Sequence, residues 1–137
     1  MARDARGGTR APSAHPAGRT GRADGGGGRT AALSMLDHLP TAVVAYNDLV
    51  AIGLMQAFAG AGVRVPQDVS VIGFDNIMAA ELVSPGLTTV ASPGRTMGTT
   101  AVKNVLAMIR GALPRSDEAF VLPTRLVVRG STGRPRR

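Results

Sequence analysis

The sequence predicts an α/β fold whose sheet contains parallel strands. Two short apolar runs, Ala42 to Tyr46 and Val69 to Phe74, are rich in β-branched residues and are predicted to be strands. Between them lie one helix and a short turn, which is the length and order of a βαβ crossover and therefore joins parallel strands. Neither run alternates strictly between apolar and polar residues, so both faces of these strands are expected to be covered.

A disordered extension is predicted to precede this fold. Residues 1–30 contain no Leu, Ile, Val or Phe and consist mainly of Gly, Arg, Ala, Pro, Ser and Thr. Such a stretch cannot bury enough apolar area to offset its loss of entropy on ordering, and it lacks the small core that a helix-turn-helix requires. Order is expected to begin near Thr30, and residues 133–137 are expected to form a disordered basic tail.

The other elements follow from periodicity and turn residues. Ala31 to Leu36 is predicted to be the end of a helix. The helix between the two strands is predicted over Leu49 to Ala59, with Asp48 as its N-cap and Gly60 and Gly62 as its stop. The later elements are a helical turn at 77–82, short strands at 87–90, 120–122 and 124–129, and an amphipathic helix at 96–110.

The net charge of +7 is concentrated at the two ends of the chain. Residues 1–30 hold six arginines and two aspartates, and residues 129–137 hold four arginines. Basic tails attract phosphate without reading sequence, so they predict at most nonspecific nucleic-acid binding, and a solvated disordered end is the favoured interpretation. The longest apolar stretch, Leu49 to Ala59, is too short to span a membrane, and no signal-peptide core is present. A cytoplasmic location is expected.

The available side chains argue against an enzyme. The sequence has no cysteine, and both histidines, His15 and His38, lie away from the predicted strand ends. No serine at those ends has a plausible base, so neither a catalytic triad nor a metal site can be assembled. The run Gly25 to Gly28 lacks the preceding strand and the Lys-Ser/Thr ending of a phosphate loop. We therefore expect a protein that is not an enzyme and requires no cofactor or metal.

Polar residues end both predicted parallel strands. Asn47 and Asp48 follow the first strand, and Asp75 and Asn76 follow the second. Because parallel strands end on the same edge, Asn47 and Asp75 are expected side by side where open α/β sheets bind ligands. An amide and a carboxylate can together donate to and accept from a polyol. The alternative for Asp75 is that it only begins a local turn.

Several motifs resemble the C-terminal end of the lactose/galactose repressor (LacI/GalR) family. They are PTA at 40–42, ND at 47–48, AIG at 51–53, VPQDVSVIGFD at 65–75, PGLTTV at 85–90 and LVVRGST at 126–132. The resemblance covers about residues 31–132 and implies an incomplete parallel-sheet lobe of a type I periplasmic-binding-protein-like fold. It also implies that residues 1–30 belong to no part of the family fold. The helix at 96–110 would cross into the first lobe, most of which is absent, and would have little to pack on.

This resemblance implies a role in transcription regulation. Family members are dimeric bacterial regulators whose affinity for DNA changes when a small sugar or nucleobase-like effector enters the cleft between two lobes. By resemblance, Asn47 and Asp75 are ligand-binding positions. The expected function is that of a C-terminal fragment of the effector-binding and dimerisation domain, able to reach a DNA operator only through a missing N-terminal domain. The alternative, a fragment of an importer's periplasmic sugar-binding protein, would need a signal peptide.

Two further expectations concern partners. The helix at 49–59 is apolar around almost its whole axis, with Gln56 as its only strongly polar side chain, so one side can lie on the sheet and the other is expected to face a second subunit in a homodimer. The chain alone is expected neither to bind a specific operator nor to respond to an effector, because it supplies only one wall of the cleft. The expected interface residues are Val50, Ile52, Met55 and Val83.

Overall fold

A computed structural model describes residues 22–112 and 121–135, and the disorder expected for residues 1–21 falls outside these ranges. A four-stranded sheet has the order β1-β2-β3-β4, in which β1, β2 and β3 are parallel and β4 runs antiparallel to β3. The predicted α/β class with parallel strands is therefore confirmed. The strands are β1 (Ala42–Val44), β2 (Ser70–Phe74), β3 (Thr88–Ala91) and β4 (Arg125–Val127).

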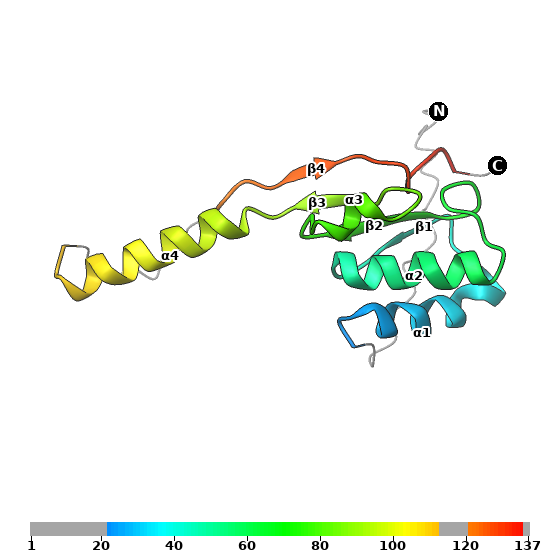
Figure 1. The fold of residues 1–137 in the computed structure, drawn as a ribbon, viewed down its shortest axis with the longest axis horizontal. Helices are drawn as coiled ribbons and strands as arrows, with labels where there is room; N and C mark the ends of the chain where they lie inside the picture. The colour runs from blue at the N-terminus through cyan, green and yellow to red at the C-terminus, as the bar shows by residue number, and fades with distance from the viewer. Residues whose placement is uncertain (1–21, 113–120, 136–137) are drawn as a thin grey trace, which may run out of the picture.

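The helices follow the predicted order with shifted ends. In Figure 1, α1 and α2 run side by side below the sheet, and α4 extends away from the body of the molecule. Of the strand predicted at 120–122, Phe120 lies outside the described residues, while Val121 and Leu122 belong to no strand, so that prediction is wrong for these two residues. The helices are α1 (Gly25–Met35), a 3-10 turn (Leu36–His38), α2 (Asp48–Gly60), α3 (Ala79–Leu82) and α4 (Gly94–Ile109).

Helix α1 begins earlier than expected. It starts at Gly25, where the Asp24 side chain accepts a hydrogen bond from the Gly27 N–H at 3.0 Å. This bond and a second one from Arg22 lower the pKa of Asp24 below its usual value. The expected start of order near Thr30 is therefore too late. The lack of large apolar residues before Leu33 did not prevent helix formation, because the glycines of α1 let its backbone lie directly against the backbone of α2.

The core lies around α2 and the two central strands. Phe58, Val69, Val71 and Leu87 are fully buried, and they pack in one cluster with residues of α1 and α2. Helix α2 ends at Gly60, close to the stop predicted from Gly60 and Gly62. Gly62 adopts a φ of +77°, and the Val63 N–H closes the helix end on the Phe58 carbonyl at 2.9 Å.

Within the described residues, the first strand is covered on one face only. Val43 is half-buried and Ala45 is buried, whereas Val44 and Tyr46, which alternate with them, are 76% and 81% exposed. The expectation that both faces would be covered is therefore wrong for this strand. The apolar composition of the strand does not show how many of its faces are covered. In the described residues, helices pack against one face.

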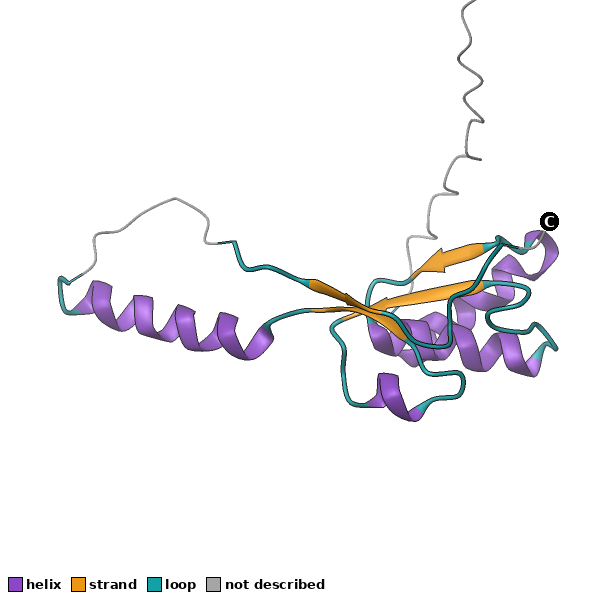
Figure 2. Ribbon diagram, turned by 90° about the horizontal axis from the view of Figure 1, so that it is seen from above, coloured by secondary structure: helices purple, strands orange, loops and turns teal. Residues whose placement is uncertain are grey.

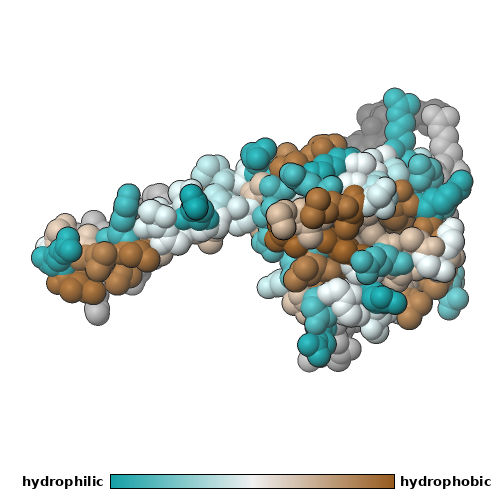
Figure 3. All heavy atoms as spheres, in the orientation of Figure 1, coloured by the Kyte–Doolittle hydropathy of each residue, from teal (hydrophilic) through white to brown (hydrophobic). Residues whose placement is uncertain are grey.

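Helix α4 forms an exposed arm. Figure 2 shows the chain leaving the body along β3, entering α4, and returning along β4. No residue of α4 is buried, which confirms that this helix has little to pack on. Apolar side chains gather on the outer part of the arm in Figure 3. The large apolar residues exposed on α4 are Met97, Val102, Val105, Leu106 and Ile109.

The segment after β4 returns to the sheet and is held there. The buried Ser131 hydroxyl donates to the Val71 carbonyl at 2.6 Å and accepts from the Thr88 N–H at 2.8 Å. The Gly133 N–H donates to the Ser70 hydroxyl at 3.2 Å. The start of the basic tail, placed at residue 133 from the sequence, is therefore still tied to the sheet.

Candidate functional site

The two residues predicted to bind a ligand lie at the same edge of the sheet. In the register of β1 and β2, Val44 pairs with Ile72. Asn47 and Asp75 each follow this pair by three residues. Asn47 is half-buried and Asp75 is exposed.

Asn47, rather than Asp48, caps helix α2. The Asn47 Oδ1 accepts from the Val50 N–H at 2.9 Å, and its Nδ2 donates to the Ala23 carbonyl at 3.0 Å. Asp48 lies in the first turn of α2 and is fully buried. The predicted capping role of Asp48 is therefore wrong. Asn47 has the extended backbone that a cap requires, with φ −151° and ψ 176°, and this frees the Asp48 carboxylate for other partners.

The buried Asp48 carboxylate joins α2 to β3 and to the loop after β2. Its Oδ1 accepts from the Thr89 hydroxyl at 2.5 Å, and its Oδ2 accepts from the Ile77 N–H at 2.8 Å. Gly73 leaves room for the carboxylate, because a Cβ at that position would lie 2.1 Å from Asp48 Oδ1.

The loop that carries Asp75 has an unusual backbone. Asp75 and Asn76 both have positive φ values, 106° and 56°, which residues with side chains seldom adopt. The Asp75 N–H donates to the Val90 carbonyl at 2.9 Å, and the Asn76 N–H donates to the Thr89 hydroxyl oxygen at 3.3 Å. The backbone of the loop is therefore anchored to β3, and the Asp75 side chain is exposed.

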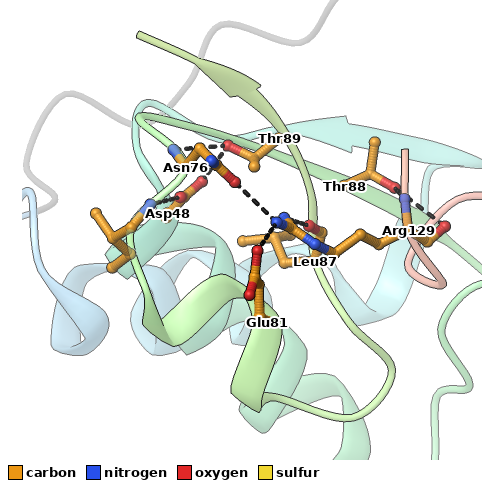
Figure 4. A network of polar contacts seen from close by, with 8 residues as sticks. Asp48, Asn76, Glu81, Leu87, Thr88, Thr89 and Arg129 are labelled. Carbon is orange, nitrogen blue, oxygen red and sulfur yellow. Dashed lines mark hydrogen bonds and ion pairs between the residues drawn. The ribbon is translucent and has the colours of Figure 1, made fainter. Parts of the chain in front are cut away.

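Arg129 anchors the same loop from the other side. Its Nη2 donates to Asn76 Oδ1 at 2.9 Å and to Glu81 Oε1 at 2.7 Å, while its Nη1 donates to the Leu87 carbonyl at 2.8 Å. Figure 4 shows Asp48, Thr89, Asn76, Arg129 and Glu81 in one continuous network. The Arg129 side chain is only 15% exposed and its bonds to Asn76 and Leu87 are partly buried, whereas the Glu81 side chain is 66% exposed, so the ion pair with Glu81 lies at the surface.

The four residues predicted to form a dimer interface divide between two cavities. Ile52, Met55 and Val83 line one groove of about 590 Å³, whereas Val50 lines a separate cavity of about 430 Å³ between α1 and β1. Helix α1 therefore covers a side of α2 that the sequence suggested for a second subunit. Met55 is also only 6% exposed, so among the three residues that line the first groove Ile52 and Val83 are the more accessible ones.

The described residues contain neither a metal cluster nor a membrane span. No group of three or more His, Cys, Asp or Glu side chains in residues 22–112 and 121–135 is placed to hold a metal ion. Over the same ranges, every helix is too short or too polar to cross a bilayer.

A sequence profile of the periplasmic binding protein-like domain matches residues 5–132. The chain belongs to this family. The match begins well before residue 31, so the expectation that residues 1–30 lie wholly outside the family pattern is wrong. Within the family, the chain is 42% identical to the HTH-type transcriptional regulator DegA of Bacillus subtilis over 106 residues, which cover 77% of this chain and 31% of DegA.

Solved structures of LacI-family regulators share the periplasmic-binding-protein-like fold of this chain. A regulator from Arthrobacter sp. FB24 in complex with lactose is 39% identical with a TM-score of 0.72, and the match covers 80% of this chain and 42% of that one. The lac repressor dimer bound to operator and the anti-inducer ONPF is 32% identical with a TM-score of 0.75, covering 82% and 39%. The predicted resemblance to the effector-binding domain of LacI-family regulators is confirmed. The chain spans less than half the length of these relatives.

Sequence reasoning missed Asp48, Thr89 and Arg129 as parts of the site. The sequence predicts only a capping role for Asp48, and Thr89 and Arg129 occur only within the motifs that resemble the family. One signal was available. Gly73 interrupts a strand of β-branched and aromatic residues, and a glycine inside a strand often marks the close approach of another group.

Proposed function

We propose that the chain forms part of the effector-binding and dimerisation domain of a bacterial LacI-family transcription regulator, with Asn47 and Asp75 as effector-binding residues. The observation that supports this best is the sheet edge, where both residues follow paired positions of β1 and β2. A related regulator with this fold was solved with lactose. Such a regulator would act in the cytoplasm and reach its operator through a separate helix-turn-helix domain. DNA binding by the present chain itself is then expected to be weak and independent of sequence.

The effector is proposed to be a sugar or a nucleobase-like molecule. The Asp75 carboxylate is exposed and accepts hydrogen bonds, which suits the hydroxyl groups of a sugar or a ring N–H. The Asn47 amide is engaged by Val50 and Ala23, but its oxygen keeps a second lone pair and its nitrogen a second N–H. Asp75 is therefore the principal contact, and Asn47 supplies additional donor and acceptor positions.

Effector titration tests this site. In the full ¹⁵N-labelled chain, a panel of ribose, lactose, cellobiose and nucleobases should shift the NMR signals of Asp75 and Asn47 with a Kd weaker than about 1 mM, because one wall leaves the ligand hydrated. Asp75→Ala should remove the shifts. Asp37→Ala, which changes an exposed carboxylate in the 3-10 turn, is the matched control and should leave them unchanged.

Two results would contradict this proposal in different ways. If no compound in the panel shifts either residue, the effector site is wrongly placed. If one compound binds below about 1 mM and Asp75→Ala abolishes this binding, the site is correct but the one-wall argument is wrong.

The groove lined by Ile52 and Val83 is the proposed homodimer surface. Both side chains are half-buried in this chain, and Met55, Val63, Val65 and Pro85 extend the apolar lining around them. Pairing two such grooves would remove apolar area from water, which is the main driving force of most protein association. One relative with this fold was solved as a dimer.

A charge in this groove should prevent self-association. We expect Ile52→Asp to convert a dimer of the full chain to a monomer in sedimentation velocity, because an unpaired carboxylate would have to be buried. Leu33→Asp is the control, since Leu33 is 63% exposed on α1 and does not line the groove. A dimer that survives Ile52→Asp, or one that is lost equally in Leu33→Asp, would refute this interface.

A further inference from the structure

The loop after β2 requires an external constraint to keep its shape. Its two consecutive residues with positive φ, Asp75 and Asn76, lie in a backbone region that costs free energy for residues with a Cβ. Asn76 lies in the left-handed region that asparagine tolerates, but the φ of 106° at Asp75 lies outside it, so the loop does not prefer this conformation by itself. Contacts from the rest of the fold must therefore hold it in place.

Besides the Val90 carbonyl and Arg129, Asp48 and Thr89 supply two of these contacts. The Asp48 carboxylate accepts from the Ile77 N–H, and the Thr89 hydroxyl donates to the same carboxylate while its oxygen accepts from the Asn76 N–H. The backbone N–H groups of Asn76 and Ile77, which follow Asp75, thus donate hydrogen bonds to one buried pair of side chains, Thr89 and Asp48. Both side chains are 0% exposed, so neither can itself contact an effector in the cleft.

The surrounding sequence accommodates this pair. Gly73 lies in β2 directly against the carboxylate, where any Cβ would meet Asp48 Oδ1 at 2.1 Å. No buried side-chain nitrogen or oxygen in the described residues lacks a hydrogen-bond partner. Each polar atom of the pair therefore has a hydrogen-bond partner, and a buried polar network with its members paired rigidifies the segments that it joins.

We propose that Asp48 and Thr89 are positioning residues that hold Asp75 in its effector-binding orientation. The inference rests on the proposed effector role of Asp75. It adds that effector affinity depends on a carboxylate at the start of α2 and a hydroxyl on β3, neither of which touches the effector. Asn47 and Asp48 then have separate roles, because Asn47 caps the helix and faces the edge while Asp48 secures the neighbouring loop.

Thr88 offers a matched control on the same strand. It is 1% exposed, and its hydroxyl oxygen accepts from the Arg129 N–H at 2.9 Å and lies 3.0 Å from the Thr132 hydroxyl. Thr88→Val therefore removes a buried hydroxyl of the same kind without removing any bond to Asn76, Ile77 or Asp48. A general loss of stability would affect both variants, whereas a loss of positioning would affect only Thr89→Val.

The experiment measures amide hydrogen exchange and effector shifts in the full ¹⁵N-labelled chain. In Thr89→Val, exchange at Asn76 and Ile77 should rise about tenfold or more relative to Ala45, whose N–H bonds the Ile72 carbonyl in the sheet. Shifts of Asp75 by ribose or lactose should fall by a similar factor. Thr89→Ser keeps the hydroxyl and should restore both quantities to within about twofold. Thr88→Val should change neither, and Asp48→Asn should behave like Thr89→Val if it folds.

The outcomes distinguish the positioning role of Asp48 and Thr89 from the proposed effector-binding role of Asp75. If Thr89→Val leaves exchange at Asn76 and Ile77 unchanged, or if Thr88→Val raises it equally, the positioning role is overturned. If exchange rises as expected but the unmodified chain shows no effector shift at Asp75, the proposed function fails while the mechanical role of the pair stands. If exchange rises and effector shifts persist undiminished in Thr89→Val, the pair holds the loop but does not position Asp75 for binding, which also overturns the inference.

Discussion

Replacing Phe58 with Ala is expected to lower the free energy of unfolding by about 3–5 kcal/mol. Phe58 is fully buried, with 0% of its surface accessible to solvent. It lies on α2 within the main apolar cluster. Truncation would remove the transfer free energy of the ring and leave a cavity between α2 and the sheet. Since domains of this size have about 5–15 kcal/mol of stability in total, the variant should be close to unfolding.

Urea denaturation of the full chain measures this loss, and Phe74→Ala is the matched control. Phe74 ends β2 and is 39% exposed, so the same chemical change removes less buried area. Its cost should be less than half that of Phe58→Ala. Equal costs at the two positions would show that the core is not centred on α2 as described.

Gly53→Ala is expected to separate α1 from α2. A Cβ at Gly53 would lie 2.1 Å from the Gly25 carbonyl oxygen and 2.8 Å from its carbon. The obstacle is backbone, which cannot rotate away as a side chain can, so the whole of α1 must shift. We expect a loss of about 2–3 kcal/mol and faster amide exchange throughout α1, because overpacking a close contact is destabilising.

Gly60→Ala provides the comparison within the same helix. Nothing lies within 4 Å of a Cβ at Gly60, and alanine is the better helix former, so stability should be unchanged or slightly higher. If Gly53→Ala were as harmless as Gly60→Ala, the close approach of α1 and α2 would be wrong. The pair of variants thus separates helix propensity from helix packing.

The sequence alone determined the order of the central elements and the edge that carries the candidate site. The apolar runs before Asn47 and Asp75, with one helix between them, are enough to predict two parallel strands that end together. The amphipathic pattern of α4 was also predictable. These features depend on short-range periodicity and on chain connectivity, which a single sequence displays directly.

Only the tertiary structure decided how each polar residue at that edge is used. Asn47 and Asp48 are both good caps by type, and the choice between them depends on Thr89, which lies 41 positions from Asp48. The start of α1 at Gly25 likewise depends on glycines that approach α2, and the separation of Val50 from Ile52 depends on which side of α2 is covered by α1. Such contacts join segments remote in the chain. Their geometry is set by packing, and local residue preferences do not encode which distant group will arrive beside a given side chain.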